Sequence, residues 1–210
     1  MPVIREVLGK DPVFGKDCFI AENATVVGDV VMGDECSIWY NAVIRGDVHY
    51  IKMGNRVNVQ DGAIIHCTYK TAPTEIGNNV SIAHNAIVHG CTLKDNVLVG
   101  MGSIIMDHCV VGSNSIIAAG AVLTKGTVVP EGSIYAGTPA RKIKEISPEL
   151  SQGEVQRIAA SYVKYASWFK TPGSDAARYM AEQATSFSEF DENKVYLGKA
   201  GCCDLRSQAT

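Results

Sequence analysis

The sequence predicts a mainly β fold, a parallel β-helix shaped as a triangular prism, with a C-terminal α-helix packed along it. An apolar residue recurs at every sixth position through most of the chain before residue 136. A small residue follows four positions later in nearly every unit, and a glycine follows almost every third apolar position. Three hexapeptides therefore make one physical period of eighteen residues. The twenty apolar positions are Phe14, Ile20, Val26, Met32, Ile38, Ile44, Met53, Val59, Ile65, Ile76, Ile82, Val88, Leu93, Val99, Ile105, Val111, Ile117, Leu123, Val129 and Tyr135.

Each hexapeptide supplies one short strand and one corner of this prism. Large side chains fill the axis, and small side chains such as Cys18, Cys36 and Cys109 fit at the crowded bends. Successive coils stack at about 4.8 Å, so residues 14–140 make a solenoid roughly 30 Å long. The pattern resembles the hexapeptide-repeat proteins, and this resemblance implies a left-handed β-helix that assembles as a trimer.

Beyond residue 145 the periodicity changes to that of an α-helix. Ser147 is a suitable N-cap, and Pro148 suits the first turn. Apolar residues then follow at helical spacing until Thr171, Pro172 and Gly173 end the pattern. A helix of about 22 residues spans about 33 Å, enough to lie along the prism. The predicted parts are a β-helix domain over 1–145, a packing helix over 146–172, and a short helix with a loosely held tail over 173–210.

Composition and charge narrow the class of protein. With 46% apolar and 20% charged residues, the composition is that of a globular protein. A formal net charge of −3 gives no basic surface for nucleic acid. No run of about 18 apolar residues is present and the first residues do not resemble a signal peptide, so we expect neither membrane insertion nor secretion. Seven cysteines without a Cys-x-x-Cys pair favour a reducing, cytoplasmic location.

A functional site is expected where the repeat is broken. After Ile44, Ile65 and Val88 the next apolar position comes nine, eleven and five residues later instead of six. When these jumps are respected, His66 and His89 occupy the same outward position in consecutive coils of one face. Two imidazoles placed in this way can share one metal ion.

His84 projects from a different side of the prism. It is the third residue of a hexapeptide on another face, so it does not meet His66 and His89 within one chain. In a three-fold trimer, His84 of one subunit lies beside His66 and His89 of the next. Three histidines and a water molecule are the coordination of a catalytic zinc ion. The remaining histidines, His49 and His108, lie at corners and are interpreted as surface residues.

The site residues carry a more specific resemblance, to the gamma-class carbonic anhydrases, which covers about residues 10–145. This resemblance implies that the three histidines bind zinc, with iron or cobalt as alternatives, at the interfaces of a homotrimer. It also implies that the substrate is carbon dioxide and the product bicarbonate. The matching segments are Ile44-Arg45-Gly46-Asp47, Asn58-Val59-Gln60-Asp61, His66 and His84 through His89.

The same resemblance implies roles for four other side chains. Arg45 and Asp47 match an arginine and an aspartate that lie between subunits. Gln60 and Asp61 match a pair beside the metal-bound water. We expect Gln60 to orient a hydroxide there, and Asp61 to hydrogen-bond to Arg45 or to the solvent.

The proton path departs from that of the best-known gamma-class members. Those proteins carry glutamates in an acidic loop, whereas the corresponding loop here offers only Glu75. Tyr50, Tyr69 and Tyr135 are candidate substitutes.

Two other functions stay open. Hexapeptide acyltransferases share the prism and the closing segment from Tyr135 to Arg141, so acyl transfer or thioester hydrolysis on a coenzyme A substrate is one alternative. Such an enzyme needs one basic histidine and no set of three. A catalytically silent scaffold subunit is the other, suggested by the missing glutamates and the C-terminal tail. Cys67 and Cys91 lie near the predicted metal ligands in sequence, and the preferred interpretation is that they are small residues tolerated at those positions.

Overall fold

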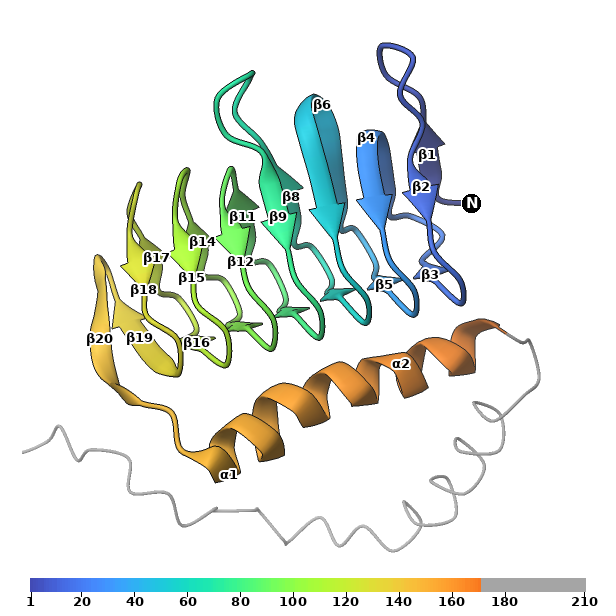
Figure 1. Ribbon diagram of the computed structural model, residues 1–210. Helices are drawn as coiled ribbons and strands as arrows, with labels where there is room; N and C mark the ends of the chain where they lie inside the picture. Colours follow the sequence, from blue (N-terminus) through green and yellow to red (C-terminus); the bar gives the residue numbers. More distant parts are fainter. Residues whose placement is uncertain (171–210) are drawn as a thin grey trace, which may run out of the picture. The chain divides into compact units, whose positions relative to one another are not determined.

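The computed structural model describes residues 1–170, which form a parallel β-solenoid followed by a helix (Figure 1). This confirms the predicted hexapeptide-repeat β-helix and its C-terminal packing helix. The larger sheet contains β1 (Val3–Arg5), β2 (Val13–Phe14), β4 (Thr25–Met32), β6 (Val43–Met53), β8 (Ile64–His66), β9 (Thr74–Ile76), β11 (Ile87–His89), β12 (Thr92–Leu93), β14 (Ile104–Ile105), β15 (Val110–Val111), β17 (Val122–Leu123) and β18 (Val128–Val129). The smaller sheet contains β3 (Phe19–Ile20), β5 (Ser37–Ile38), β7 (Asn58–Val59), β10 (Ser81–Ile82), β13 (Leu98–Val99), β16 (Ile116–Ile117), β19 (Ser133–Gly137) and β20 (Ala140–Glu145).

The strands form the three faces of a prism. The smaller sheet is one face, and it ends in the antiparallel pair of β19 and β20. The larger sheet forms the other two faces, because the long strands β4 and β6 run around the corner between them. Thus β6 pairs with β8 on one side of this corner and with β9 on the other. The cross-section is therefore the predicted triangle.

Large apolar side chains fill the axis of the solenoid, as the sequence predicts. All but three of the twenty recurring apolar residues are buried, and the exceptions, Phe14, Ile20 and Tyr135, are half-buried in the terminal coils. Cys36 and Cys109 are fully buried in the same core. Burial of this apolar surface, at about 25 cal/mol per Å², is the main stabilising contribution to the fold.

The recurring glycine marks the closest approach of neighbouring coils. A Cβ atom on Gly54 would lie 2.9 Å from backbone atoms of Gly77 and 2.7 Å from Asn78 Oδ1. That oxygen occupies the space because it accepts a hydrogen bond of 2.9 Å from the Asn55 amide. A side chain at position 54 would therefore force the coils apart.

Three irregular connections lie at one corner of the prism in three consecutive coils. The first adds residues within β6, the second adds residues between β8 and β9, and the third, between β11 and β12, is one residue short. The strand pairings confirm the predicted register across all three. In Figure 1 the bend of β6 and the connection from β8 to β9 extend beyond the neighbouring turns. The corrected register places His66 opposite His89.

The C-terminal helix begins where the sequence predicts. The Ser147 hydroxyl accepts a hydrogen bond of 3.2 Å from the Leu150 amide and caps α1 (Pro148–Leu150). A π-helical turn, η1 (Ser151–Gln156), then leads into α2 (Arg157–Lys170). The sequence spacing does not predict this π-helical interruption.

The helix lies along the face formed by the smaller sheet (Figure 1). Trp39 is buried on that face, and its ring centroid lies 5.4 Å from the ring centroids of Tyr162 and Phe169. Ala159 and Ala166 are the buried residues of α2, and their small side chains allow the helix to lie close to the solenoid. These contacts confirm that the helix packs against the prism.

None of the helices within residues 1–170 is long and apolar enough to cross a membrane. The solenoid and its helix form one compact unit. The predicted short helix and tail over 173–210 lie outside the described residues, so that part of the sequence analysis stays a prediction.

Candidate metal centre

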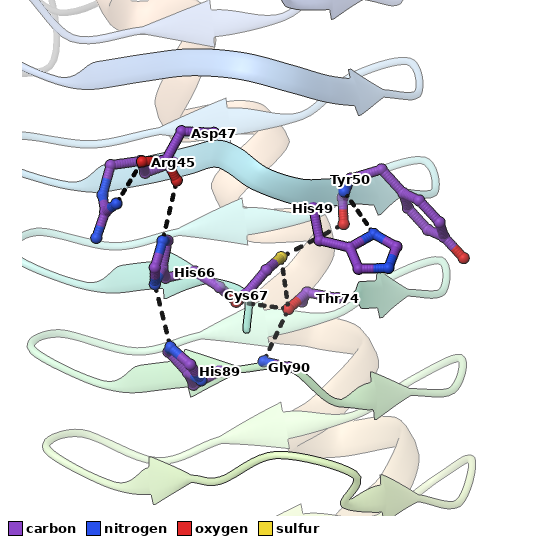
Figure 2. Close-up of polar contacts among 9 residues, drawn as sticks. All are labelled: Arg45, Asp47, His49, Tyr50, His66, Cys67, Thr74, His89 and Gly90. Atoms are coloured by element: carbon purple, nitrogen blue, oxygen red, sulfur yellow. Dashed lines mark hydrogen bonds and ion pairs between the residues drawn. The ribbon is translucent and has the colours of Figure 1, made fainter. Parts of the chain in front are cut away.

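Two histidines meet on one face of the solenoid, at the ends of paired strands. β8 ends at His66 and β11 ends at His89, and the two residues lie opposite each other in the parallel register. Their neighbours Ile65 and Val88 are buried, so the alternation of a strand points both imidazoles outward. His66 Nδ1 lies 3.1 Å from His89 Nε2 (Figure 2). The predicted stacking of these two side chains is confirmed.

A carboxylate holds the outer nitrogen of each ring. Asp47 Oδ1 lies 3.0 Å from His66 Nε2, and Asp107 Oδ1 lies 3.1 Å from His89 Nδ1. Asp47 comes from the coil before His66, and Asp107 from the coil after His89. Because an ionised carboxylate only accepts hydrogen bonds, the two outer nitrogens are the ones that carry hydrogens.

Local contacts favour the protonation states that this geometry needs. Burial raises the pKa of Asp47, but hydrogen bonds from Arg45 and His66 outweigh burial and hold that pKa below its usual value. Burial acts to raise the pKa of Asp107 as well. Hydrogen bonds from Thr68 and His89 outweigh burial, so the pKa of Asp107 lies below its usual value. Burial lowers the pKa of His66 against the opposing effect of Asp47. At neutral pH both carboxylates are therefore ionised and His66 is neutral.

The facing nitrogens of the histidine pair have no hydrogen between them when both rings are neutral. A neutral imidazole carries one N–H, and in each ring this group is the outer one. Two lone pairs therefore point toward each other across 3.1 Å, and a shared proton or a metal cation relieves their repulsion. Nitrogens bound to one tetrahedral zinc ion lie about 3.3 Å apart. His66 and His89 thus have the spacing and the chemistry of two ligands of one metal ion.

The third predicted ligand lies on a different face. His84 occupies the turn between β10 and β11, where its Nδ1 lies 3.0 Å from Asp61 Oδ2. Across residues 1–170, no group of three His, Cys, Asp or Glu side chains converges closely enough to hold a metal ion. The binding of a metal by His66 and His89, completed by His84 of a neighbouring subunit, therefore stays a prediction.

The other predicted site residues fall into two groups. Arg45 Nη1 lies 2.6 Å from Asp47 Oδ2, which places both beside the histidine pair (Figure 2). Gln60 and Asp61 follow β7 on the face of the smaller sheet, where Gln60 is buried and donates a 3.0 Å hydrogen bond to Asn58 Oδ1. Within the described part of the chain Asp61 contacts His84, whereas Arg45 lies on a different face. The expected hydrogen bond of Asp61 to Arg45 or to the solvent stays a prediction.

Two residues of this centre are missing from the sequence prediction. Asp107 Oδ1 accepts the hydrogen bond from His89 and a second one, of 2.6 Å, from Thr68 Oγ1. Thr68 lies near the start of the connection between β8 and β9, and Asp107 follows β14. The signal that could have pointed to Asp107 is that it is an acidic residue one coil after His89, in the turn that follows β14.

Cys67 and Cys91 are core residues, as the preferred interpretation holds. The buried Cys67 Sγ lies 3.4 Å from the Tyr50 carbonyl oxygen and 3.5 Å from Thr74 Oγ1. Burial raises the pKa of the Cys67 thiol, and burial likewise raises the pKa of Cys91. Both thiols therefore stay protonated at neutral pH.

Two candidate proton carriers contact each other at the irregular corner. Tyr50 Oη lies 2.8 Å from Glu75 Oε1. Figure 2 shows the Tyr50 ring pointing away from His66 and His89. His49 lies beside Tyr50 and accepts a hydrogen bond of 2.9 Å from its amide, so this histidine stands apart from the pair.

This chain is similar to known proteins, both in its hexapeptide repeat and over most of its length. A family described as bacterial transferase hexapeptide (six repeats) matches residues 11–46 and 90–125. Gamma carbonic anhydrase 1, mitochondrial, of Arabidopsis thaliana is 36% identical over 201 residues, 93% of this chain and 69% of the relative. The carbonic anhydrase of Geobacillus kaustophilus is 39% identical over 162 residues, 77% of this chain and 88% of the relative. The crystal structure of a hexapeptide transferase family protein from Anaplasma phagocytophilum has a TM-score of 0.76 and 39% sequence identity, over 80% of this chain and 98% of its own.

Proposed function

Because the chain belongs to the gamma carbonic anhydrase-like family of hexapeptide-repeat proteins, we propose that it is a metal-dependent lyase that hydrates carbon dioxide to bicarbonate. One observation carries the proposal: the facing nitrogens of His66 and His89 lie 3.1 Å apart while carboxylates hold their outer nitrogens. We place zinc at the interfaces of a homotrimer, with His84 supplied by the neighbouring subunit. Iron or cobalt suits the same imidazole ligands.

Zinc bound at this position would supply Lewis acidity, which brings the deprotonation of a water molecule close to neutral pH. The residues of the chain determine where this happens. His66 and His89 would hold the metal, and Asp47 and Asp107 orient the two rings through the outer nitrogens. The outward direction of both imidazoles opens the centre to a small substrate.

Arg45 places a positive charge beside this centre. Its guanidinium binds one oxygen of Asp47, while the other oxygen of Asp47 holds His66. Arg45 therefore fixes the carboxylate that orients a metal ligand. Its side chain is 45% exposed, so further N–H groups of the guanidinium are accessible to the anionic product, bicarbonate.

Gln60 and Asp61 act from the face that carries His84. Asp61 orients the His84 ring through Nδ1, which leaves Nε2 as the nitrogen that binds the metal. Asn58 holds the Gln60 carboxamide in place, and we assign Gln60 to orient the reacting water from the neighbouring subunit. The proposed centre thus takes residues from two faces that only adjacent subunits bring together.

Metal analysis and a hydration assay test this function. Protein purified without added zinc is expected to contain bound metal and to hydrate carbon dioxide in stopped-flow measurements, and His89→Ala is expected to lose both properties. His108→Asn is the matched control, because His108 is an exposed turn residue with φ +60°, a conformation that asparagine tolerates. Wild-type protein without metal, or equal hydration by the wild type and His89→Ala, would overturn the proposal.

Acyl transfer is the competing reaction, since the relative from Anaplasma is named as a hexapeptide transferase family protein. A histidine that acts as a general base needs a free nitrogen directed at the substrate. Here the facing nitrogens of His66 and His89 point at each other, and carboxylates hold the outer nitrogens. Turnover of acetyl-coenzyme A without hydration of carbon dioxide would favour acyl transfer, and bound zinc without either activity would favour a scaffold.

A further inference from the structure

Asp107 lies one coil beyond His89 and reaches back to it. Its Oδ1 accepts hydrogen bonds from two side chains, His89 Nδ1 at 3.1 Å and Thr68 Oγ1 at 2.6 Å. The Asp107 carbonyl oxygen accepts a 2.9 Å hydrogen bond from the Gly126 amide, which anchors this turn to the following coil. The main chain of Asp107 is therefore anchored to the following coil, and its carboxylate is held by two side-chain donors.

Gly90 makes room for this contact. A Cβ atom at position 90 would lie 2.4 Å from Asp107 Oδ1 and 2.8 Å from the Ala72 Cβ atom. The backbone of Gly90 also has φ +53°, which side chains rarely adopt. The glycine directly after His89 thus opens the path through which a carboxylate from the next coil reaches the histidine.

The connection between β8 and β9 links Asp107 to both histidines. Thr68, near its start, donates to Asp107, and Thr74, the first residue of β9, donates a 2.7 Å hydrogen bond to the His66 carbonyl oxygen. Thr74 Oγ1 also accepts a 3.0 Å hydrogen bond from the Gly90 amide. Thr74 therefore connects the backbones of β8 and β11, which carry the two histidines, and Thr68 holds the Asp107 carboxylate beside His89.

We propose that Asp107, fixed by Thr68, is a positioning residue that sets the ring orientation and tautomer of His89 so that Nε2 faces the metal. This inference rests on the proposed function. A metal-binding histidine commonly donates its other N–H to a carboxylate, and loss of such a partner weakens metal binding by about 10- to 100-fold. Asp107 occupies that place for His89, and no metal ligand is altered when it is replaced.

Zinc affinity of the full-length protein, measured by chelator competition, tests the role of Asp107. Asp107→Ala is expected to weaken zinc binding by about 10- to 100-fold. Asp29→Ala is the matched control, because Asp29 is a partly exposed aspartate whose Oδ2 lies 3.8 Å from Lys10 Nζ. Unchanged affinity in Asp107→Ala would overturn the inference and leave the proposed function intact, whereas a wild-type protein that binds no zinc would overturn both.

A second measurement reads the tautomer directly in the metal-free protein. Proton–nitrogen correlation spectra of the imidazole rings are expected to place the His89 hydrogen on Nδ1 in the wild type and to show a mixture of tautomers in Asp107→Ala. A hydrogen on Nε2 in the wild type would contradict the inference without reference to metal. If Asp107→Ala does not fold, Thr68→Val provides a milder change that replaces the hydroxyl by a methyl group of similar size. A loss of zinc affinity of about fivefold in Thr68→Val supports the inference, and no loss overturns it.

Discussion

His84 Nδ1 lies 3.0 Å from Asp61 Oδ2, and the two residues come from neighbouring coils of one face. This contact repeats on another face what Asp47 does for His66 and Asp107 does for His89. Each histidine of the proposed metal set therefore has one ring nitrogen held by an aspartate. The arrangement favours a common role, because a carboxylate behind an imidazole fixes the direction of the nitrogen that binds the metal.

Mixed trimers test whether the metal lies between subunits. His84→Ala and His89→Ala are each expected to abolish hydration of carbon dioxide when every subunit carries the substitution. When both variants are co-expressed with different tags and mixed trimers are purified, one interface of the three combines an intact His84 with an intact His89. Activity is then expected to return to about one third of the wild-type value.

The control for this experiment is a mixture of separately assembled trimers, which has no such interface and is expected to stay inactive. Mixed trimers without activity would show that the three histidines do not cooperate across an interface. Activity in the unmixed His84→Ala protein would remove His84 from the site altogether.

Removal of the metal is expected to lower thermal stability. A ligand that binds only the folded state stabilises it by about 2.7 kcal/mol when its free concentration is 100 times the dissociation constant. Differential scanning calorimetry after chelation, and again after zinc is restored, measures this effect. His89→Ala is expected to give the same unfolding temperature with and without zinc. An equal response of the wild type and His89→Ala would place the stabilising metal elsewhere.

Much of the fold follows from the sequence because the repeat leaves little choice. An apolar side chain at every sixth residue must point to the axis, and a change of spacing must be absorbed at a corner if the next strand is to stay in register. For this reason the jump from Ile65 to Ile76 could be located, and the stacking of His66 on His89 could be predicted. The π-helical turn in the C-terminal helix could not, because apolar spacing does not distinguish it from regular α-helix.

The site was less predictable than the fold because its hydrogen bonds join different coils. Asp107 is a polar residue in a turn, and only the folded register shows that its carboxylate passes Gly90 and reaches His89. The partner of Asp61 was missed for a related reason. The family resemblance suggests that Asp61 lies beside the metal. Its contact with His84, however, follows only from the fold, which places both residues on one face of the solenoid.

The repeat also predicts where a substitution is costly. Ile117→Ala removes a fully buried side chain from the axis and is expected to lower the free energy of unfolding by about 2 to 5 kcal/mol. Ile143→Ala makes the same chemical change at a position that is 61% exposed, and a change within about 0.5 kcal/mol is expected. Urea unfolding followed by circular dichroism measures both. A similar cost at the two positions would contradict the assignment of the axis.

Stability at alkaline pH should depend on the contact between the helix and the solenoid. Burial, with smaller effects of Asp61 and Tyr165, raises the pKa of Tyr162 to about 12. A tyrosine in an unfolded chain ionises at about pH 10, so Tyr162 loses its proton in the unfolded state first as the pH rises. The contribution of Tyr162 is therefore complete below about pH 10 and is lost between about pH 10 and pH 12.

Tyr162→Phe removes this ionisation and keeps the ring that packs against Trp39. Its free energy of unfolding is expected to fall less steeply than that of the wild type above about pH 10. In the wild type the ionised Tyr162 of the unfolded chain must regain its proton on folding, whereas phenylalanine does not ionise. Urea unfolding at several alkaline pH values measures the two slopes, and ultraviolet titration of the folded proteins should show one fewer late-ionising tyrosine in the variant. Parallel slopes would mean that the Tyr162 hydroxyl is as free to ionise in the folded protein as in the unfolded chain.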